Sequence, residues 1–199
     1  MFGFDPAGRK DGSALLVLDA TESPRRVVYL EDLRGRSYPE QVARVAQLAA
    51  AYRPTRVALD ATGLGDVVLD LLRDAGVPVD PIRFTASVKA DLVQSIAVAL
   101  ERRELVLPPH AGLIEELRQL RVERTPAGHD RYEAPPGAND DRVFALALAL
   151  RAAGPVLSRS FAHTGALPFL MGDEPQRRYS PVSTDPIEAW FAWADGSGT

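Results

Sequence analysis

Apolar runs alternate with polar turns along the first sixty residues and predict strands. Short runs rich in apolar and β-branched residues, bounded by Gly, Pro and Ser, are typical of strands. Three such runs cover residues 2–5, 14–20 and 26–30. Because short links join them, we expect an antiparallel meander. Apolar positions then recur at helical spacing and predict a helix over Tyr38–Tyr52, with Ser37 as its N-cap.

Strand and helix patterns alternate from there to residue 153. Strands are predicted at 57–60, 79–84 and 105–107, and helices at 66–75, 87–102, 113–120 and 139–153. Two further runs, 121–124 and 130–133, flank a Thr-Pro-Ala-Gly-His loop and predict a β-hairpin. A meander followed by alternating segments predicts an α/β fold, a mixed sheet with helices on both faces.

The pattern fades after Gly154, where Pro, Ser and Gly become frequent. We therefore expect one domain over residues 1–153 and a tail over 154–199. Within the tail, Ile187–Trp193 holds both tryptophans. This segment either docks on its own domain or binds a partner.

Composition narrows the class of protein. Hydrophobic residues make up 46% and charged residues 25% of the 199 positions, as in ordinary globular proteins. No apolar run reaches 18 residues, so no transmembrane helix is predicted. The chain lacks cysteine, which excludes disulfides and thiolate metal sites. A net charge of −4 argues against wrapping nucleic acid by charge alone, but it does not exclude local DNA contacts.

Four aspartates stand at element ends. Asp5 and Asp60 end the first and fourth predicted strands, and Asp140 and Asp141 open the last helix. Taken singly, each suits a turn or the positive end of a helix. If the two strands are neighbours, however, Asp5 and Asp60 meet at one sheet edge, where α/β proteins bind ligands.

Clustered carboxylates repel one another, and a hard divalent cation relieves that cost. Oxygen ligands favour Mg²⁺ or Mn²⁺. Two such ions, roughly 3.5–4 Å apart, would clamp the attacking and leaving oxygens of a phosphodiester. The aspartates therefore predict metal-dependent phosphodiester hydrolysis that needs no side-chain nucleophile.

Four motifs, taken in order, carry a family resemblance. They are Gly-Phe-Asp-Pro-Ala at 3–7, Lys-Asp-Gly-Ser at 10–13, Leu-Asp-Ala-Thr-Gly-Leu-Gly at 59–65 and Asn-Asp-Asp at 139–141. Over residues 1–153 the chain resembles the C-terminal nuclease domain of the large terminase subunit of tailed bacteriophages. The resemblance implies a ribonuclease H-like fold: a mixed five-stranded sheet with helices on both faces, plus a β-hairpin. One departure is Asn139, which stands where the family often has His.

The resemblance also implies a function. Asp5, Asp60, Asp140 and Asp141 would bind two Mg²⁺ or Mn²⁺ ions and carry catalysis. The protein would be an endodeoxyribonuclease that cuts concatemeric double-stranded DNA with little sequence preference, in the cytoplasm of the infected bacterial host. In the full-length context its partners would be a packaging ATPase domain, the portal and the small terminase subunit, and no membrane is involved.

DNA contacts are expected from basic residues around the predicted site. The candidates are Lys10, Lys89, Arg121, Arg124, Arg131 and Arg142. Such contacts would position the DNA backbone and carry little sequence information. For each of them a solvated surface charge is the ordinary alternative.

Other functions stay open at this point. A junction resolvase or a transposase-type nuclease would use a similar acidic cluster. The protein could also be a non-catalytic docking module of a packaging motor, in which the acidic cluster no longer has a catalytic role. The chain contains no Gly-x-x-x-x-Gly-Lys-Ser/Thr motif, so we expect either an excised nuclease domain or a nuclease-only prophage relic.

Overall fold

A six-stranded mixed sheet forms the centre of the domain. The computed structural model describes residues 1–154 except 10, 64, 125–129, 134 and 136–137. The strands are β1 (Phe2–Asp5), β2 (Ala14–Asp19), β3 (Arg25–Asp32), β4 (Val57–Asp60), β5 (Val79–Ile82) and β6 (Leu105–Val106). Their order is β5-β4-β1-β2-β3-β6, and β2 is antiparallel to both of its neighbours.

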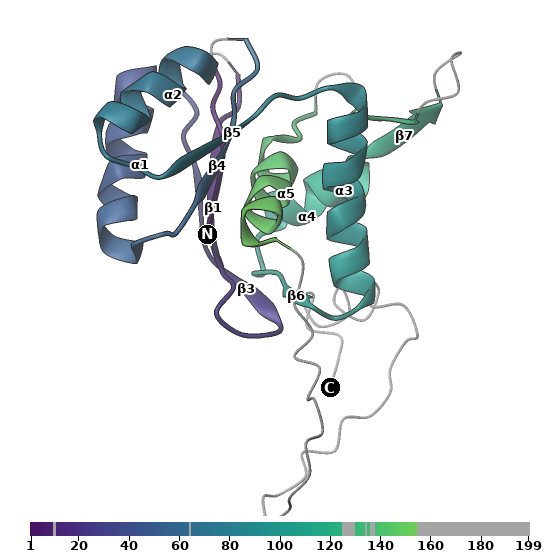
Figure 1. The fold of residues 1–199 in the computed structure, drawn as a ribbon. Helices are drawn as coiled ribbons and strands as arrows, with labels where there is room; N and C mark the ends of the chain where they lie inside the picture. Colours follow the sequence, from purple (N-terminus) through teal and green to yellow (C-terminus); the bar gives the residue numbers. More distant parts are fainter. Residues whose placement is uncertain (10, 64, 125–129, 134, 136–137, 155–199) are drawn as a thin grey trace, which may run out of the picture. The chain divides into compact units, whose positions relative to one another are not determined.

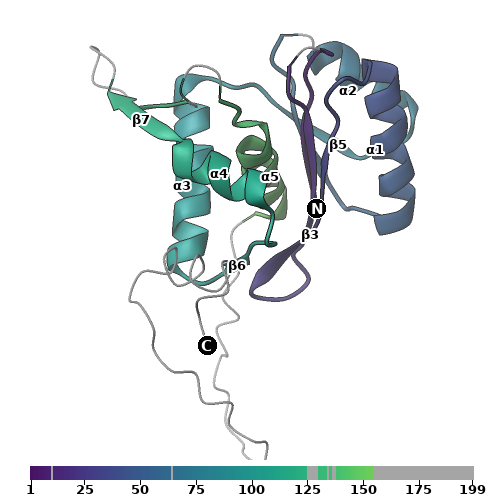
Figure 2. The same ribbon diagram turned by 180° about the vertical axis from the view of Figure 1, so that it is seen from behind.

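Helices cover both faces of this sheet, as Figures 1 and 2 show. They are α1 (Tyr38–Tyr52), α2 (Gly65–Asp74), α3 (Ala86–Glu101), α4 (Ala111–Gln119) and α5 (Asp141–Ala153). The α1 and α2 helices pack on one face, and α5 crosses the other with α3 and α4 against it. The predicted mixed α/β fold with helices on both faces is confirmed.

Strand alternation decides what each face carries. Phe2 and Phe4 are fully buried in the core formed with α1 and α2. Gly3 points the other way, and a Cβ there would lie 1.8 Å from the carbonyl oxygen of Ala145 in α5. Since side chains two residues apart share a face, Asp5 lies on the α5 side of the sheet.

Local signals at the helix ends behave largely as expected. Ser37 caps α1, and the backbone N–H of Ser37 donates a hydrogen bond to the Glu40 carboxylate at 2.6 Å. The start of the last helix was predicted wrongly at Asn139. Asp140 is the cap residue, and α5 begins at Asp141.

The expectation of five strands also needs correction. β6 adds a sixth strand by pairing parallel to β3. Arg25 donates its backbone N–H to the carbonyl of Glu104 at 2.9 Å, which draws this two-residue strand to the sheet edge. A segment this short has no periodicity from which sequence could assign a partner.

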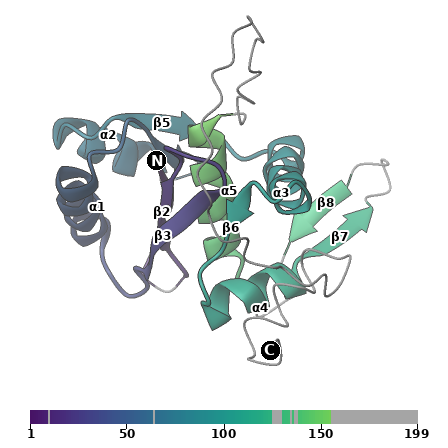
Figure 3. The ribbon, with the colours of Figure 1, turned by 90° about the horizontal axis from the view of Figure 1, so that it is seen from below.

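The predicted hairpin is present as a separate two-stranded sheet. β7 (Arg121–Arg124) and β8 (Asp130–Glu133) pair antiparallel, with Arg121 opposite Glu133. β8 lies beside α3 (Figure 3). The hairpin loop and residues 155–199, including Ile187–Trp193, lie outside the described residues, so the division at residue 153 stays a prediction. No helix in the described part of the chain is long and apolar enough to cross a membrane.

Candidate active site

Two of the predicted carboxylates end adjacent parallel strands. In the β1–β4 pairing Phe4 lies opposite Leu59, so the next residues, Asp5 and Asp60, are neighbours. Both follow a residue that faces α1 and α2, and both therefore point toward α5. The juxtaposition expected from sequence is confirmed.

The start of α5 brings the other two carboxylates to the same edge. Gly12, in the turn between β1 and β2, leaves room for the Asp141 side chain. A Cβ at Gly12 would clash with the carboxylate of Asp141, so a larger residue there would push the Asp141 side chain out of this position. Asp140, as the cap residue, stands directly before it.

Neighbouring carboxylates act electrostatically on Asp5 and Asp141. Burial raises the pKa of Asp5 well above its usual value, the negative charges of Asp60, Asp141 and Asp140 raise it further, and Lys89 opposes them. Burial also raises the pKa of Asp141, and the negative charge of Asp140 raises it further. Burial and the neighbouring negative charges both disfavour the ionised carboxylates, and a bound cation would relieve that cost.

The chemistry of the site fits a hard divalent cation, although a ligand shell is not already closed. Among the described residues, no three Asp, Glu or His side chains are arranged as a finished metal site. Four carboxylates at one sheet edge nevertheless supply the oxygen donors that Mg²⁺ and Mn²⁺ prefer. To hold an ion, the carboxylate side chains would have to move closer together than they lie in this structure.

A pH dependence follows from the Asp5 shift. The folded state binds the Asp5 proton more tightly than the unfolded chain does, so this residue destabilises the metal-free fold as pH rises above 3.8, its usual pKa. Asp5→Asn should therefore raise the melting temperature in EDTA at about pH 8, and by less as pH falls toward about 4. Melting curves of both proteins across this range test it, and a gain that grows on acidification would contradict it.

Lys89, a predicted DNA-binding residue, lies where its charge acts on the aspartate cluster. Its Nζ lies 4.5 Å from the ring centroid of Phe144 and 5.5 Å from that of Phe84. The two rings are themselves 5.2 Å apart. They hold the ammonium by cation–π attraction where its charge reaches Asp5.

Arg142 lies in an ion-pair network with a clear structural role. Its guanidinium donates to Asp32 at 2.6 Å and also to Glu116, whose side chain is only 5% exposed. Glu116 in turn accepts the backbone N–H groups of Arg142 and Val143, at 2.8 and 3.3 Å. A carboxylate from α4 thus caps the first turn of α5. A DNA contact by Arg142 stays an untested prediction, and it would compete with these partners.

The remaining basic candidates are not tested by side-chain geometry. Lys10 lies outside the described residues. Arg121, Arg124 and Arg131 stand on β7 and β8, whose backbone pairing is described while these side chains are not. Their position on the hairpin agrees with the prediction but does not show a DNA contact.

Sequence reasoning missed three residues that shape the site. Gly12 makes room for Asp141, Arg34 opposes the rise in the Asp141 pKa, and Glu116 caps α5. Gly12 lies inside one of the four motifs that carry the family resemblance. Nothing along the chain links Glu116 with a helix that starts 25 residues later.

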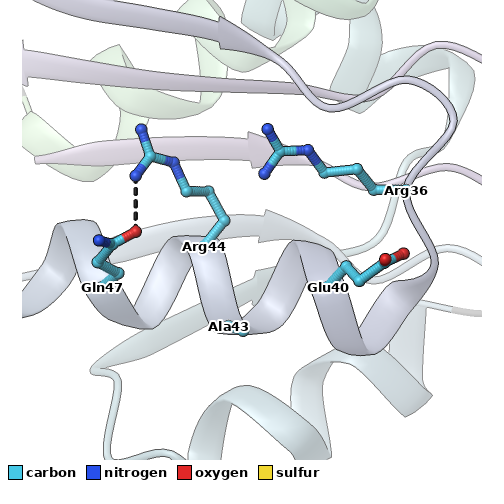
Figure 4. A pocket seen from close by; sticks show the side chains of 5 residues that line it. All are labelled: Arg36, Glu40, Ala43, Arg44 and Gln47. Carbon is cyan, nitrogen blue, oxygen red and sulfur yellow. Dashed lines mark hydrogen bonds between the residues drawn. The ribbon is translucent and has the colours of Figure 1, made fainter.

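A hollow of about 450 Å³ lies along α1 and is shown in Figure 4. Its lining residues are Arg36, Glu40, Ala43, Arg44 and Gln47. The Arg44 guanidinium already donates to Glu31 at 2.7 Å, and Arg36 donates to the same carboxylate at 2.9 Å. Because α1 covers the sheet face opposite α5, this hollow is separate from the aspartate cluster.

The chain belongs to the terminase RNase H-like domain family, whose model matches residues 2–153. The resemblance found in the motifs is thereby confirmed, together with the ribonuclease H-like fold.

Individual relatives come from phages of Thermus. The large terminase subunit of Thermus virus P23-45 is 32% identical over 148 residues, which are 74% of this chain and 30% of that protein. The chain thus aligns with under a third of its curated relative. The large terminase nuclease of phage G20c superposes with a TM-score of 0.69 at 30% identity, over 75% of this chain and 80% of that one. The same nuclease has been solved with bound magnesium, again with a TM-score of 0.69 at 30% identity, over 75% and 79% of the two chains.

Proposed function

We propose that this protein is a metal-dependent endodeoxyribonuclease that hydrolyses phosphodiester bonds. The observation that carries the proposal is the meeting of Asp5, Asp60 and the Asp140–Asp141 pair at one sheet edge. The family match and the magnesium-bound relative support it. They also favour a terminase nuclease over a junction resolvase or a transposase.

The four aspartates would hold two Mg²⁺ or Mn²⁺ ions. Such ions lower the pKa of the attacking water and stabilise the departing 3′ oxygen. Asp5 ends β1, so a rigid strand holds its backbone in place before substrate arrives. The Asp141 carboxylate lies against Gly12, in the turn between β1 and β2.

Lys89 would neutralise part of the added charge when a phosphate enters. Its ammonium is held between two aromatic rings and the carboxylates, so little side-chain entropy remains to be lost on binding. The arginines of the β7–β8 hairpin would track the DNA backbone beyond the site. Contacts of this kind predict cutting with little sequence preference.

The biological setting belongs to the same proposal. The substrate would be concatemeric double-stranded phage DNA, cut in the cytoplasm of the infected host. A packaging ATPase domain, the portal and the small terminase subunit would be the partners.

Cleavage of supercoiled plasmid tests the proposed activity. We expect nicked and linear products with Mg²⁺ or Mn²⁺, because the carboxylates need a cation to approach a phosphate. We expect none in EDTA. Agarose gels over a time course provide the measurement. Intact plasmid under all metal conditions would instead favour the non-catalytic docking module.

A further inference from the structure

Thr62 holds the Asp60 carboxylate from two directions. Its backbone N–H donates to Asp60 Oδ1 at 2.9 Å, and its hydroxyl donates to the same oxygen at 2.5 Å. Both donors reach one oxygen, so together they set the rotation of the carboxylate and the direction in which Oδ2 lies.

The same hydroxyl connects this turn to the segment after β5. Thr62 Oγ1 accepts the backbone N–H of Phe84 at 2.8 Å. The Phe84 ring borders the Lys89 ammonium and contacts Phe144 of α5. One hydroxyl group therefore links the orientation of Asp60 to the placement of the aromatic residues around Lys89.

An identical tripeptide elsewhere in the sheet shows what the turn does by itself. Asp19-Ala20-Thr21 ends β2, and Thr21 donates its N–H and hydroxyl to Asp19 Oδ1 at 3.0 and 2.7 Å. These bonds lower the pKa of Asp19, the N–H bond first and the hydroxyl bond next. Because β2 runs antiparallel to β1, this turn lies at the sheet edge opposite the aspartate cluster.

We propose that Thr62 is a positioning residue of the candidate metal site: its hydroxyl orients Asp60 to receive a divalent cation and anchors Phe84 beside Lys89. The inference rests on the proposed function and assigns no contact between Thr62 and the cation. Partners that orient a metal ligand typically change metal affinity by 10–100-fold when they are removed.

Titration calorimetry with Mn²⁺ alone, on the full chain, tests the proposal without any need for activity. Thr62→Val keeps the shape of the side chain and removes the hydroxyl, and it should weaken Mn²⁺ binding by about 10–100-fold. Thr62→Ser restores the hydroxyl and should bind within a few-fold of wild type. Thr21→Val removes the matching hydroxyl at the opposite edge and should leave the affinity unchanged. If Thr62→Val does not fold, Thr62→Ala provides a second variant without the hydroxyl.

The outcomes separate this inference from the proposed function. Wild-type affinity in Thr62→Val, or equal loss in Thr62→Ser or Thr21→Val, would overturn the role of the Thr62 hydroxyl while leaving the metal site in place. A wild-type protein that binds no Mn²⁺ would overturn the metal site, and with it this inference.

Discussion

Asp5→Asn should abolish metal-dependent DNA cleavage while leaving the domain folded. Asp5 is the most strongly perturbed carboxylate of the site and ends the central strand β1. Groups that stabilise developing charge in a transition state commonly contribute about 10²–10³-fold, so we expect cleavage to fall by at least about 100-fold. Plasmid cleavage in Mn²⁺ and melting curves with and without Mn²⁺ are the measurements. Mn²⁺ should stabilise the wild type more than the variant, since the cation loses one ligand.

Asp19→Asn is the matched control for this experiment. Asp19 also ends a strand of the same sheet, but at the opposite edge, and its pKa is lowered rather than raised. The control should cleave at the wild-type rate, and it should not gain stability in EDTA. Wild-type cleavage by Asp5→Asn would contradict the assignment of Asp5, and equal loss in both variants would point to a general effect on the fold.

Glu116→Ala should produce the largest loss of stability among the substitutions considered. Glu116 is buried, caps α5 and pairs with Arg142. Its removal leaves two backbone N–H groups without their partner, and the Arg142 guanidinium keeps only Asp32. Removing one member of a buried ion pair lowers the free energy of unfolding by about 3–5 kcal/mol. Because Arg142 is partly exposed, we expect the lower end of this range, about 3 kcal/mol. For a domain of this size that corresponds to a fall of about 6–12 °C in melting temperature.

Two further variants resolve the contributions of this network. Glu116→Gln keeps an acceptor for the N–H groups but loses the charge, so its loss should be smaller. Asp32 is 45% exposed, and Asp32→Asn should cost at most about 1 kcal/mol. Thermal melts in EDTA rank the three variants. A loss for Asp32→Asn equal to that for Glu116→Ala would show that the exposed pair, rather than the buried cap, stabilises α5.

The sequence determined much of this protein because its signals are local. Short apolar runs predicted β1 and β4, helical spacing predicted α1, and Ser37 marked where that helix starts. Asp5 and Asp60 could be singled out because each directly follows an apolar strand. Motif order then identified the family, since several weak motifs in one order are far more specific than any of them alone.

Only the tertiary structure decided which side chains meet. The role of Glu116 depends on the approach of α4 to the start of α5, and that of Gly12 on a carboxylate 129 positions away. The structure also places Arg142, a candidate for DNA binding, in a partly buried ion-pair network that sequence did not predict. Likewise, the two identical Asp-Ala-Thr turns lie at opposite ends of the strands because β4 is parallel to β1 and β2 is antiparallel to it. Only the turn after β4 therefore lies at the aspartate cluster. The type of each residue determines which hydrogen bonds it can make. Which residue becomes its partner depends on packing between segments that are distant in the chain.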